Sequence, residues 1–210
     1  EFPFYPQFYV PLDDVAPDVL VDEGEEVTTP FGRARRFGLR VGGREAPGSA
    51  RVHAAYDDSE VAGHVRFDWA ALDSWFEEDE QVYVHPRNPY VRVDALRSQR
   101  HVRVELDGVL LAESSTPVML FETGLPARTY LPRTDVAWDA LVPSDTISDC
   151  PYKGTTTAYW STATTPDVAW SYAFPTQAVA AVAGLVAFFD ELVDVTVDGT
   201  LQARPQTRHA

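Results

Sequence analysis

The chain is poor in the residues that build disulfides, zinc sites and membrane spans. Cys150 is the single cysteine among 210 residues, so the chain cannot form a disulfide within itself or supply a four-cysteine zinc site. One cysteine fits a reducing compartment, and the sequence shows no signal peptide, so we expect a cytoplasmic protein. The longest apolar stretch, residues 178–189, is too short to span a bilayer.

Positive charge is scarce as well. The sequence has 17 Lys and Arg against 32 Asp and Glu, which gives a formal charge of −15. Such a chain repels polyphosphates at long range, so we expect no nucleic acid among its partners. Without an apolar span we expect no membrane either, and the acidic charge is typical of a highly soluble protein.

Common catalytic and cofactor motifs are missing. There is no glycine-rich phosphate loop, no Gly-x-Ser-x-Gly elbow, and no His-x-x-x-His or Cys-x-x-Cys spacing. The sequence therefore predicts no cofactor and no bound metal, and it does not point to one reaction.

What the sequence does contain is a repeat at a fixed offset of 121 residues. Tyr9-Val10-Pro11 returns as Tyr130-Leu131-Pro132. The same offset relates three further pairs: Asp14-Val15-Ala16 with Asp135-Val136-Ala137, Pro30-Phe31 with Pro151-Tyr152, and Ala62-Gly63 with Ala183-Gly184. One register held over so long a stretch predicts two copies of one structural unit. The second copy has an opening hairpin that the first lacks, so we expect an N-terminally truncated first copy, either because the sequence given omits its start or because the copy itself is shorter.

Each copy reads as a series of short strands separated by Gly and Pro turns. Val102–Leu106 and Val109–Ala112 alternate apolar residues around Asp107-Gly108, a strong hairpin signal. The period-two set Val168, Trp170, Tyr172 and Phe174 predicts one strand with all four side chains on one face. We therefore expect an all-β fold of two units of antiparallel sheets. The predicted boundaries are 1–85 for a degenerate first repeat, 86–100 for an arginine-rich connector, 101–202 for the second repeat and 203–210 for a polar tail.

The connector carries several arginines in an otherwise acidic chain. Two interpretations stay open: the arginines pair with the protein's own carboxylates, or one or two of them bind an anionic group of a ligand between the units.

Cys150-Pro151-Tyr152-Lys153-Gly154 is the densest group of reactive side chains. A thiolate is a nucleophile, a lysine amine forms Schiff bases and a tyrosine transfers protons, so Cys150, Lys153 and Tyr152 are the catalytic candidates. The alternative for Cys150 is a buried small hydrophobic residue.

Comparison of the copies suggests where a site lies. The first copy has Thr29 where the second has Cys150, and it has no residue at the position of Lys153. Aromatic side chains around a cavity bind flat or apolar molecules, although such residues also fill ordinary cores. The predicted ligand-binding residues are Glu122, Tyr130, Asp145, Tyr152, Lys153, Trp160, Trp170 and Tyr172.

Several motifs of the second copy together carry a family resemblance. They are Val102-Arg103-Val104-Glu105, Asp107-Gly108, Glu122-Thr123-Gly124, Tyr130-Leu131-Pro132, Pro143-Ser144-Asp145, Cys150-Pro151-Tyr152-Lys153-Gly154, Ala169-Trp170-Ser171-Tyr172 and Gly184-Leu185-Val186-Ala187-Phe188. Over residues from about 100 to 200 the chain resembles the bacterial domain of unknown function 427, and the whole chain resembles its tandem form. The resemblance implies a β-tent fold, in which two antiparallel sheets lean together at a steep angle. It does not extend to the four-cysteine zinc site of similar folds.

Three functions remain open at this point. The first is binding of a small molecule in an aromatic pocket of the second repeat. The second is an enzyme that acts on a small carbonyl or amide compound through Lys153, Tyr152 or Cys150. The third is an interaction scaffold that uses the arginine-rich connector. An unpaired sheet edge in the truncated copy would also favour a homodimer.

Overall fold

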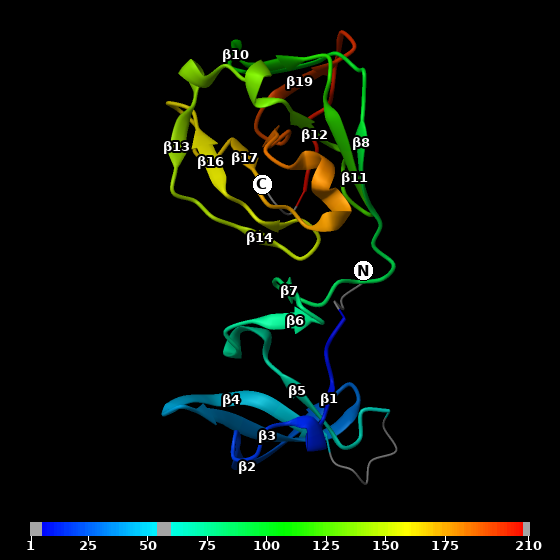
Figure 1. Ribbon diagram of the computed structural model, residues 1–210, viewed down its shortest axis with the longest axis vertical. Coiled ribbons are helices and arrows are strands. Elements are labelled where there is room, and N and C mark those ends of the chain that lie inside the picture. The colour runs from blue at the N-terminus through cyan, green and yellow to red at the C-terminus, as the bar shows by residue number, and fades with distance from the viewer. Residues whose placement is uncertain (1–5, 54–59, 208–210) are drawn as a thin grey trace. The chain divides into compact units, whose positions relative to one another are not determined.

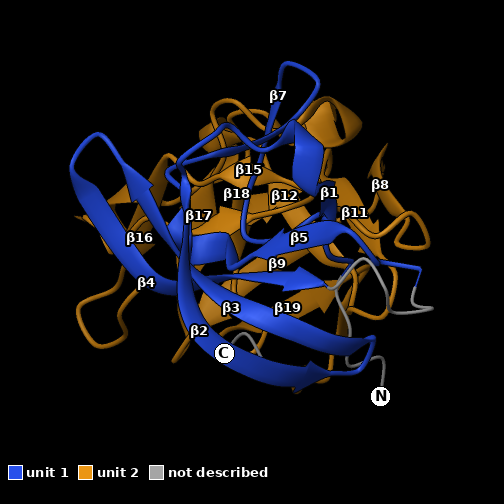
Figure 2. Cartoon of the chain, turned by 90° about the horizontal axis from the view of Figure 1, so that it is seen from below, with its two compact units in different colours: residues 1–86 blue, residues 87–210 orange. Residues whose placement is uncertain are grey.

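The computed structural model describes residues 6–53 and 60–207 and consists mainly of β-strands (Figure 1). Each strand pairing in this part of the chain is antiparallel, which confirms the predicted all-β fold. The chain divides into two compact units, residues 1–86 (unit 1) and 87–210 (unit 2), coloured separately in Figure 2. No helix within the described ranges is long and apolar enough to cross a membrane.

Unit 1 is built on one five-stranded sheet with the order β1-β5-β4-β3-β2. Its strands are β1 (Val10–Pro11), β2 (Leu20–Thr29), β3 (Gly32–Val41), β4 (Arg44–His53) and β5 (His64–Phe67). Short 3₁₀ helices η1 (Leu12–Asp14) and η2 (Trp69–Ala71) and a small hairpin of β6 (Trp75–Glu77) and β7 (Glu80–Val82) complete it. Its buried core is small and centres on Leu39, Ala50 and Val65.

Unit 2 contains a four-stranded sheet with the order β10-β9-β19-β20. Its strands are β9 (Val102–Leu106), β10 (Val109–Ser114), β19 (Asp194–Val197) and β20 (Thr200–Leu201). Asp107 and Gly108 both adopt positive φ, 51° and 78°, as the turn of a tight hairpin requires. The predicted Asp-Gly hairpin is therefore confirmed.

A seven-stranded sheet with the order β13-β16-β17-β18-β12-β11-β8 forms the rest of unit 2. Its strands are β8 (Val93–Arg97), β11 (Val118–Glu122), β12 (Arg128–Leu131), β13 (Val142–Ser144), β16 (Ala158–Ser161), β17 (Ala169–Ser171) and β18 (Val186–Phe188). A hairpin of β14 (Asp149–Cys150) and β15 (Gly154–Thr155) and the 3₁₀ helices η3 (Arg133–Asp135), η4 (Trp138–Ala140) and η5 (Gln177–Val182) connect these strands. Part of the predicted connector, residues 86–100, thus forms the edge strand β8.

Both faces of the seven-stranded sheet are covered. On one face, Leu131, Val186 and Phe188 pack with residues of the four-stranded sheet in a core between the two sheets. On the other face, Tyr130 and Trp170 belong to a second core that includes residues of η5, which lies against β8. Consecutive residues of one strand alternate between these two cores.

One prediction about strand faces is wrong. Trp170 and Tyr172 do belong to the same core, but Val168 packs in the core between the sheets and Phe174 is exposed. The cause is the short length of β17, Ala169–Ser171. Outside these three residues the backbone is not extended in the sheet, so the period-two alternation does not continue.

Candidate functional site

A short hairpin presents the reactive residues singled out in the sequence. Cys150 pairs with Gly154 between β14 and β15, and the Lys153 amide donates to the Cys150 carbonyl at 3.3 Å. These contacts define a β-turn with Pro151 at its second position, where the fixed φ of proline is favourable. Gly154 has φ of 93°, which glycine adopts without strain. The tip of the hairpin therefore carries Tyr152 and Lys153.

Three hydrogen bonds hold this hairpin in place. The Thr176 hydroxyl donates to the Tyr152 carbonyl at 2.6 Å, and the Thr176 amide donates to the Lys153 carbonyl at 3.1 Å. The Tyr152 hydroxyl accepts a hydrogen bond from the backbone amide of Asn88 at 3.0 Å. Tyr152 thus ties the hairpin to both η5 and the segment before β8, which is a positioning role.

Lys153, the single lysine of the sequence, forms a buried ion pair. Its ammonium donates to Oε2 of Glu122, at the end of β11, at 2.5 Å, and the two side chains are 14% and 8% exposed. Burial by itself lowers the pKa of Lys153, but Cys150 and Glu122 raise it, and the net pKa lies above the usual value. The amine is therefore protonated at neutral pH, which disfavours a Schiff base at this position.

The register of the sheet brings two aromatic rings together on the same face. Tyr130 pairs with Ala187, and Ala187 pairs with Trp170. Because the methyl group of Ala187 is small, the two rings meet across it edge to face, with centroids 6.3 Å apart. The Trp170 indole nitrogen donates to the Tyr130 hydroxyl at 3.3 Å.

Two buried tyrosine hydroxyls interact with the charges around Lys153. Burial raises the pKa of Tyr130 to about 12, and Lys153 is the main group that opposes this shift. Burial also raises the pKa of Tyr172 strongly, and Tyr130, Cys150 and Glu122 add to the shift. Tyr172 is 3% exposed, and its hydroxyl has no hydrogen-bond partner among the described residues. We call Glu122, Tyr130, Cys150, Lys153 and Tyr172 the Lys153 cluster.

The structure does not bring the remaining predicted residues into this cluster. Trp160 follows Tyr159 on β16 and faces the opposite side of the sheet, where its ring lies 5.1 Å from that of Trp138. Asp145 is exposed in the loop after β13. The aromatic side chains predicted as pocket walls are, apart from Tyr152, buried in the two cores: Tyr130, Trp160, Trp170 and Tyr172.

A second buried ionic group was missed in the sequence. Arg128 donates to both carboxylate oxygens of Glu191 at 2.9 Å and lies 3.4 Å from Asp190. Burial raises the pKa of Asp190 to about 6 although Arg128 opposes this. Burial also acts to raise the pKa of Glu191, but hydrogen bonds, led by those from Arg128, lower it to about 2. The only signal in the sequence is a pair of acids at the end of the longest apolar stretch.

The connector arginines behave in two ways. Arg92, like Arg103 just beyond the connector in β9, pairs with carboxylates of the same unit. Arg97 and Arg100 have no ion pair within the described part of the chain. The residues that the structure describes contain no group of three or more His, Cys, Asp or Glu placed to hold a metal ion.

The fold and the cluster define an all-β protein with a buried lysine–glutamate pair on one face of an antiparallel sheet. The chain belongs to the family described as "Domain of unknown function (DUF427)", whose model matches residues 94–199, half of the chain. This match lies within unit 2 and contains the whole Lys153 cluster. A search of curated proteins finds none that matches the chain.

Proposed function

We propose that this protein binds a small molecule at the Lys153 cluster, and that the ligand presents a carbonyl or carboxylate oxygen to it. The observation that carries the proposal is the Tyr172 hydroxyl, which belongs to a residue only 3% exposed and donates no hydrogen bond to any described residue. A ligand oxygen that accepts a hydrogen bond from this hydroxyl would gain roughly 0.5–1.5 kcal/mol of binding free energy.

The neighbouring groups support a ligand that accepts hydrogen bonds. The Tyr130 hydroxyl already accepts from Trp170, so its own proton is available to a second acceptor. The Lys153 ammonium has three donor hydrogens, of which one is directed to Glu122. The cluster therefore offers more donors than acceptors, an arrangement that suits a carbonyl or carboxylate oxygen.

The buried rings serve this site as supports. Tyr130 and Trp170 are packed in the core and hold the donors in fixed positions. Cys150, Tyr152 and Lys153 are only partly buried, so we propose that the ligand reaches the cluster from the side of the hairpin.

The single lysine gives a direct test. Protein labelled with carbon-13 at the ε-carbon of lysine has one signal from Lys153, and acetate, acetamide, benzoate and benzamide serve as probes. We expect a saturable shift of this signal with at least one probe, and about three- to tenfold weaker binding in Tyr172→Phe. Tyr90→Phe, an exposed tyrosine of unit 2, is the matched control and should bind normally. The proposal is contradicted if none of the probes gives a saturable shift, or if Tyr172→Phe binds the probe as tightly as the original protein.

A second candidate function is catalysis through Cys150. It is favoured by the position of Cys150 on the hairpin that carries Lys153, because a nucleophilic cysteine needs a base or a cationic neighbour. In this case a small electrophile should alkylate Cys150 faster than a model thiol at neutral pH, and Lys153→Met should slow the reaction. An ordinary rate that is insensitive to Lys153→Met removes this candidate. Borohydride trapping tests the Lys153 imine, which the raised pKa disfavours.

We further propose that unit 1 and part of unit 2 are copies of one module. In unit 1 the strands lie side by side in the order β1-β5-β4-β3-β2, and in unit 2 in the order β12-β18-β17-β16-β13. When the strands of each set are numbered along the chain, the two orders are the same. The pairing Val10↔Val65 has its counterpart in Leu131↔Val186, and η1 corresponds to η3, all at the offset of 121.

The hairpins of the two units support the same proposal. Thr29 pairs with Gly32 in unit 1 as Cys150 pairs with Gly154 in unit 2, and both glycines have positive φ, 102° and 93°. Lys153 is the additional residue of the longer turn. Superposition of the two meanders in a crystal structure should place these residue pairs on each other, and a best fit in another register would contradict the duplication.

A further inference from the structure

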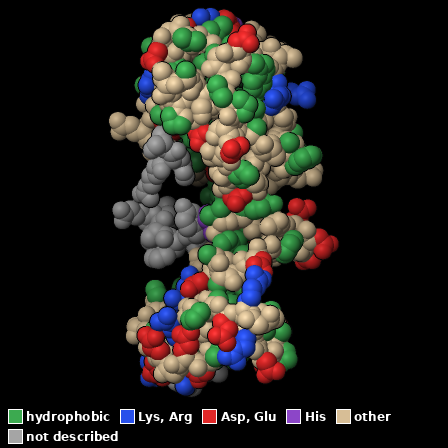
Figure 3. Space-filling model, turned by 90° about the vertical axis from the view of Figure 1, so that its left-hand side faces the viewer, with side chains coloured by type: hydrophobic (Ala, Val, Ile, Leu, Met, Phe, Trp, Pro, Cys, Tyr) green, Lys and Arg blue, Asp and Glu red, His purple; other side chains and the backbone are tan. Residues whose placement is uncertain are grey.

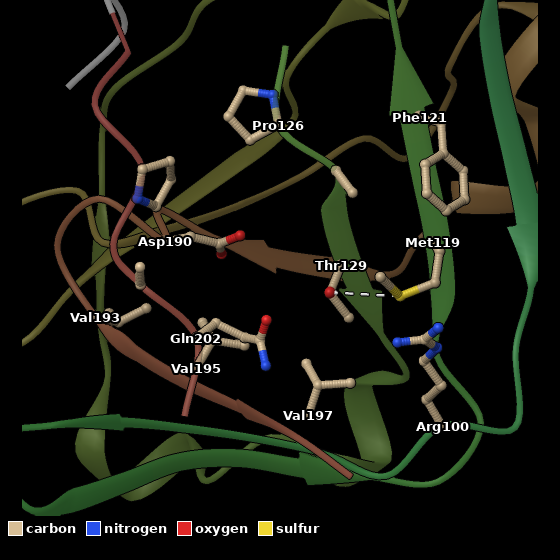
Figure 4. A pocket seen from close by; sticks show the side chains of 13 residues that line it. Arg100, Met119, Phe121, Pro126, Thr129, Asp190, Val193, Val195, Val197 and Gln202 are labelled. Carbon is tan, nitrogen blue, oxygen red and sulfur yellow. Dashed lines mark hydrogen bonds between the residues drawn. The ribbon is translucent and has the colours of Figure 1, made fainter. Parts of the chain in front are cut away.

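Unit 2 contains a pocket on the face of the sheet opposite to the Lys153 cluster. Its volume is about 340 Å³, and it is lined by β11, β12, β19 and the segment that follows β20 (Figure 4). Met119 and Thr129 line it, whereas their chain neighbours Leu120 and Tyr130 point into the core on the other face. The two locations are therefore separated by the sheet itself.

The lining of this pocket is more apolar than polar, and its polar side chains are those of Arg100, Thr129, Asp190 and Gln202. Val193 and Val195 are buried at its base, and Met119 and Phe121 form one wall. The Thr129 hydroxyl donates to the Met119 sulfur at 3.6 Å, drawn as the dashed line in Figure 4, so this polar group is already engaged. Such a surface favours a hydrocarbon chain or ring rather than a sugar or nucleotide.

Charged groups lie at opposite ends of the pocket. Figure 4 shows Arg100 at one end and Asp190 at the other. Asp190 lies 3.4 Å from Arg128, whereas Arg100 is exposed and forms no ion pair with any described residue. Arg97 also lacks an ion pair among the described residues although carboxylates outnumber cations in the sequence, but of these two arginines Arg100 lines the pocket.

We propose that this pocket binds an amphipathic carboxylic acid, with its apolar chain or ring over Val193 and Val195 and its carboxylate on the guanidinium of Arg100. Arginine presents paired N–H donors that match a carboxylate. Asp190 repels an anion at the other end, so the two charges fix one orientation of the ligand. The pocket volume is near the lower limit for small-molecule sites, which favours a single short chain or ring.

Met119, the single methionine of the sequence, reports on this pocket. With a carbon-13 methyl label on methionine, we would titrate the full chain with octanoate, with 1-octanesulfonate as a probe that stays ionised at all accessible pH values, and with 1-octanol as the uncharged control. We expect a saturable shift of the Met119 signal with both anions and roughly tenfold weaker binding of octanol.

Substitutions distinguish binding in this pocket from non-specific attraction of anions to the protein. Arg100→Gln should reduce the affinity for both anions roughly tenfold, to about that for octanol, while Arg97→Gln, which removes the same charge from β8, should change it less than twofold. Ala203→Trp, on an exposed lining residue outside the sheets, should fill the pocket and abolish the shift. Tyr172→Phe should leave it intact.

Three outcomes would overturn the inference. The first is the absence of a saturable shift with either anion in the unaltered protein. The second is an equal loss in Arg97→Gln and Arg100→Gln, which would indicate non-specific attraction of anions. The third is a loss in Tyr172→Phe with no effect of Ala203→Trp, which would place the binding at the Lys153 cluster.

Discussion

The sheets of the two units share one strand order, and under the proposed duplication a row of residues paired across neighbouring strands carries different side chains in each unit. The row consists of Arg36, Arg51 and Arg66 in unit 1, and of Tyr159, Trp170 and Ala187 in unit 2. The arginines form ion pairs with partly exposed acids, and charged side chains gather over unit 1 at the bottom of Figure 3. The row in unit 2 is packed in the core that includes η5.

The opposite face of each sheet differs much less. Ala50 and Val65 in unit 1 are fully buried, and so are Ala169 and Val186 in unit 2. This face maintains the fold in both units, because small and β-branched residues pack closely against the sheet there. The side chains therefore differ mainly on the other face of each sheet, and in unit 2 that face carries the Lys153 cluster.

The same contrast holds for the energy of the ion pairs. Exposed pairs contribute roughly 0–1 kcal/mol, since water and salt screen them. Removal of one partner from a buried pair costs about 3–5 kcal/mol, because the other charge is left without compensation. The comparison thus predicts large effects in unit 2 and small ones in unit 1.

The largest effect is expected from Arg128→Met. Arg128 and Glu191 have side chains only 13% and 4% exposed, so loss of the guanidinium leaves two buried carboxylates unpaired. We expect the free energy of unfolding to fall by about 3–5 kcal/mol, measured by urea unfolding. Hydrogen exchange should localise the loss to unit 2. A cost below about 1 kcal/mol would show that this pair behaves like a surface pair.

Asp190→Asn should stabilise the protein in a pH-dependent way. The pKa of Asp190 is raised to about 6 in the folded state, above an unfolded value of about 3.9. Its favourable contribution is therefore complete below about pH 4 and is lost as the pH rises through 6. Each unit of this difference corresponds to about 1.4 kcal/mol, so at pH 8 the variant should gain up to about 3 kcal/mol over the original protein.

The control for this titration is the adjacent carboxylate. The pKa of Glu191 is lowered to about 2, so its stabilising contribution is present above about pH 4.5 and is lost as the pH falls through 2. Glu191→Gln should consequently destabilise at neutral pH, opposite in sign to Asp190→Asn. Equal signs for the two variants would show that the neighbouring acids are not distinguished by Arg128.

The ion pair of Arg128 also shows why the sequence predicts local elements of the fold better than it predicts the contacts of a site. The hairpin at Asp107-Gly108 follows from local alternation and turn chemistry, and the structure contains it. The ion pair of Arg128 with Glu191 joins residues 63 positions apart. No local pattern encodes such a contact, because it depends on which strands become neighbours.

The Lys153 cluster could be predicted from the sequence only in part. The turn Cys150-Pro151-Tyr152-Lys153 is legible in the sequence, and Glu122 and Tyr172 were singled out with it. Trp160 was included too, yet it faces the other core, since one step along β16 reverses the side of the sheet. The sequence therefore indicates which residues of this region to consider. The side of the sheet on which each side chain lies depends on the register of the strands.

A smaller loss of stability is expected when the glycine of either hairpin, Gly154 or Gly32, is replaced by alanine. In Gly154→Ala a new Cβ would lie 3.6 Å from the carbonyl oxygen of Phe174, an ordinary contact, so the cost comes from φ of 93°. We expect a loss of about 1–2 kcal/mol in thermal or urea unfolding. Gly32→Ala, at φ of 102°, should cost a similar amount if the two hairpins are equivalent. A cost at only one of the two positions would weaken the proposed duplication.

The smallest effect is expected from Arg51→Met in unit 1. Under the proposed duplication, Arg51 corresponds to Trp170. It pairs with Asp68 at 2.5 Å, and the two side chains are 29% and 40% exposed. Water screens this pair, so the substitution should change the free energy of unfolding by less than about 1 kcal/mol. A double-mutant cycle with Asp68→Asn should give a coupling of about 0.2–1 kcal/mol that weakens in high salt. A coupling of several kcal/mol, insensitive to salt, would mean that this row is buried in unit 1 as it is in unit 2.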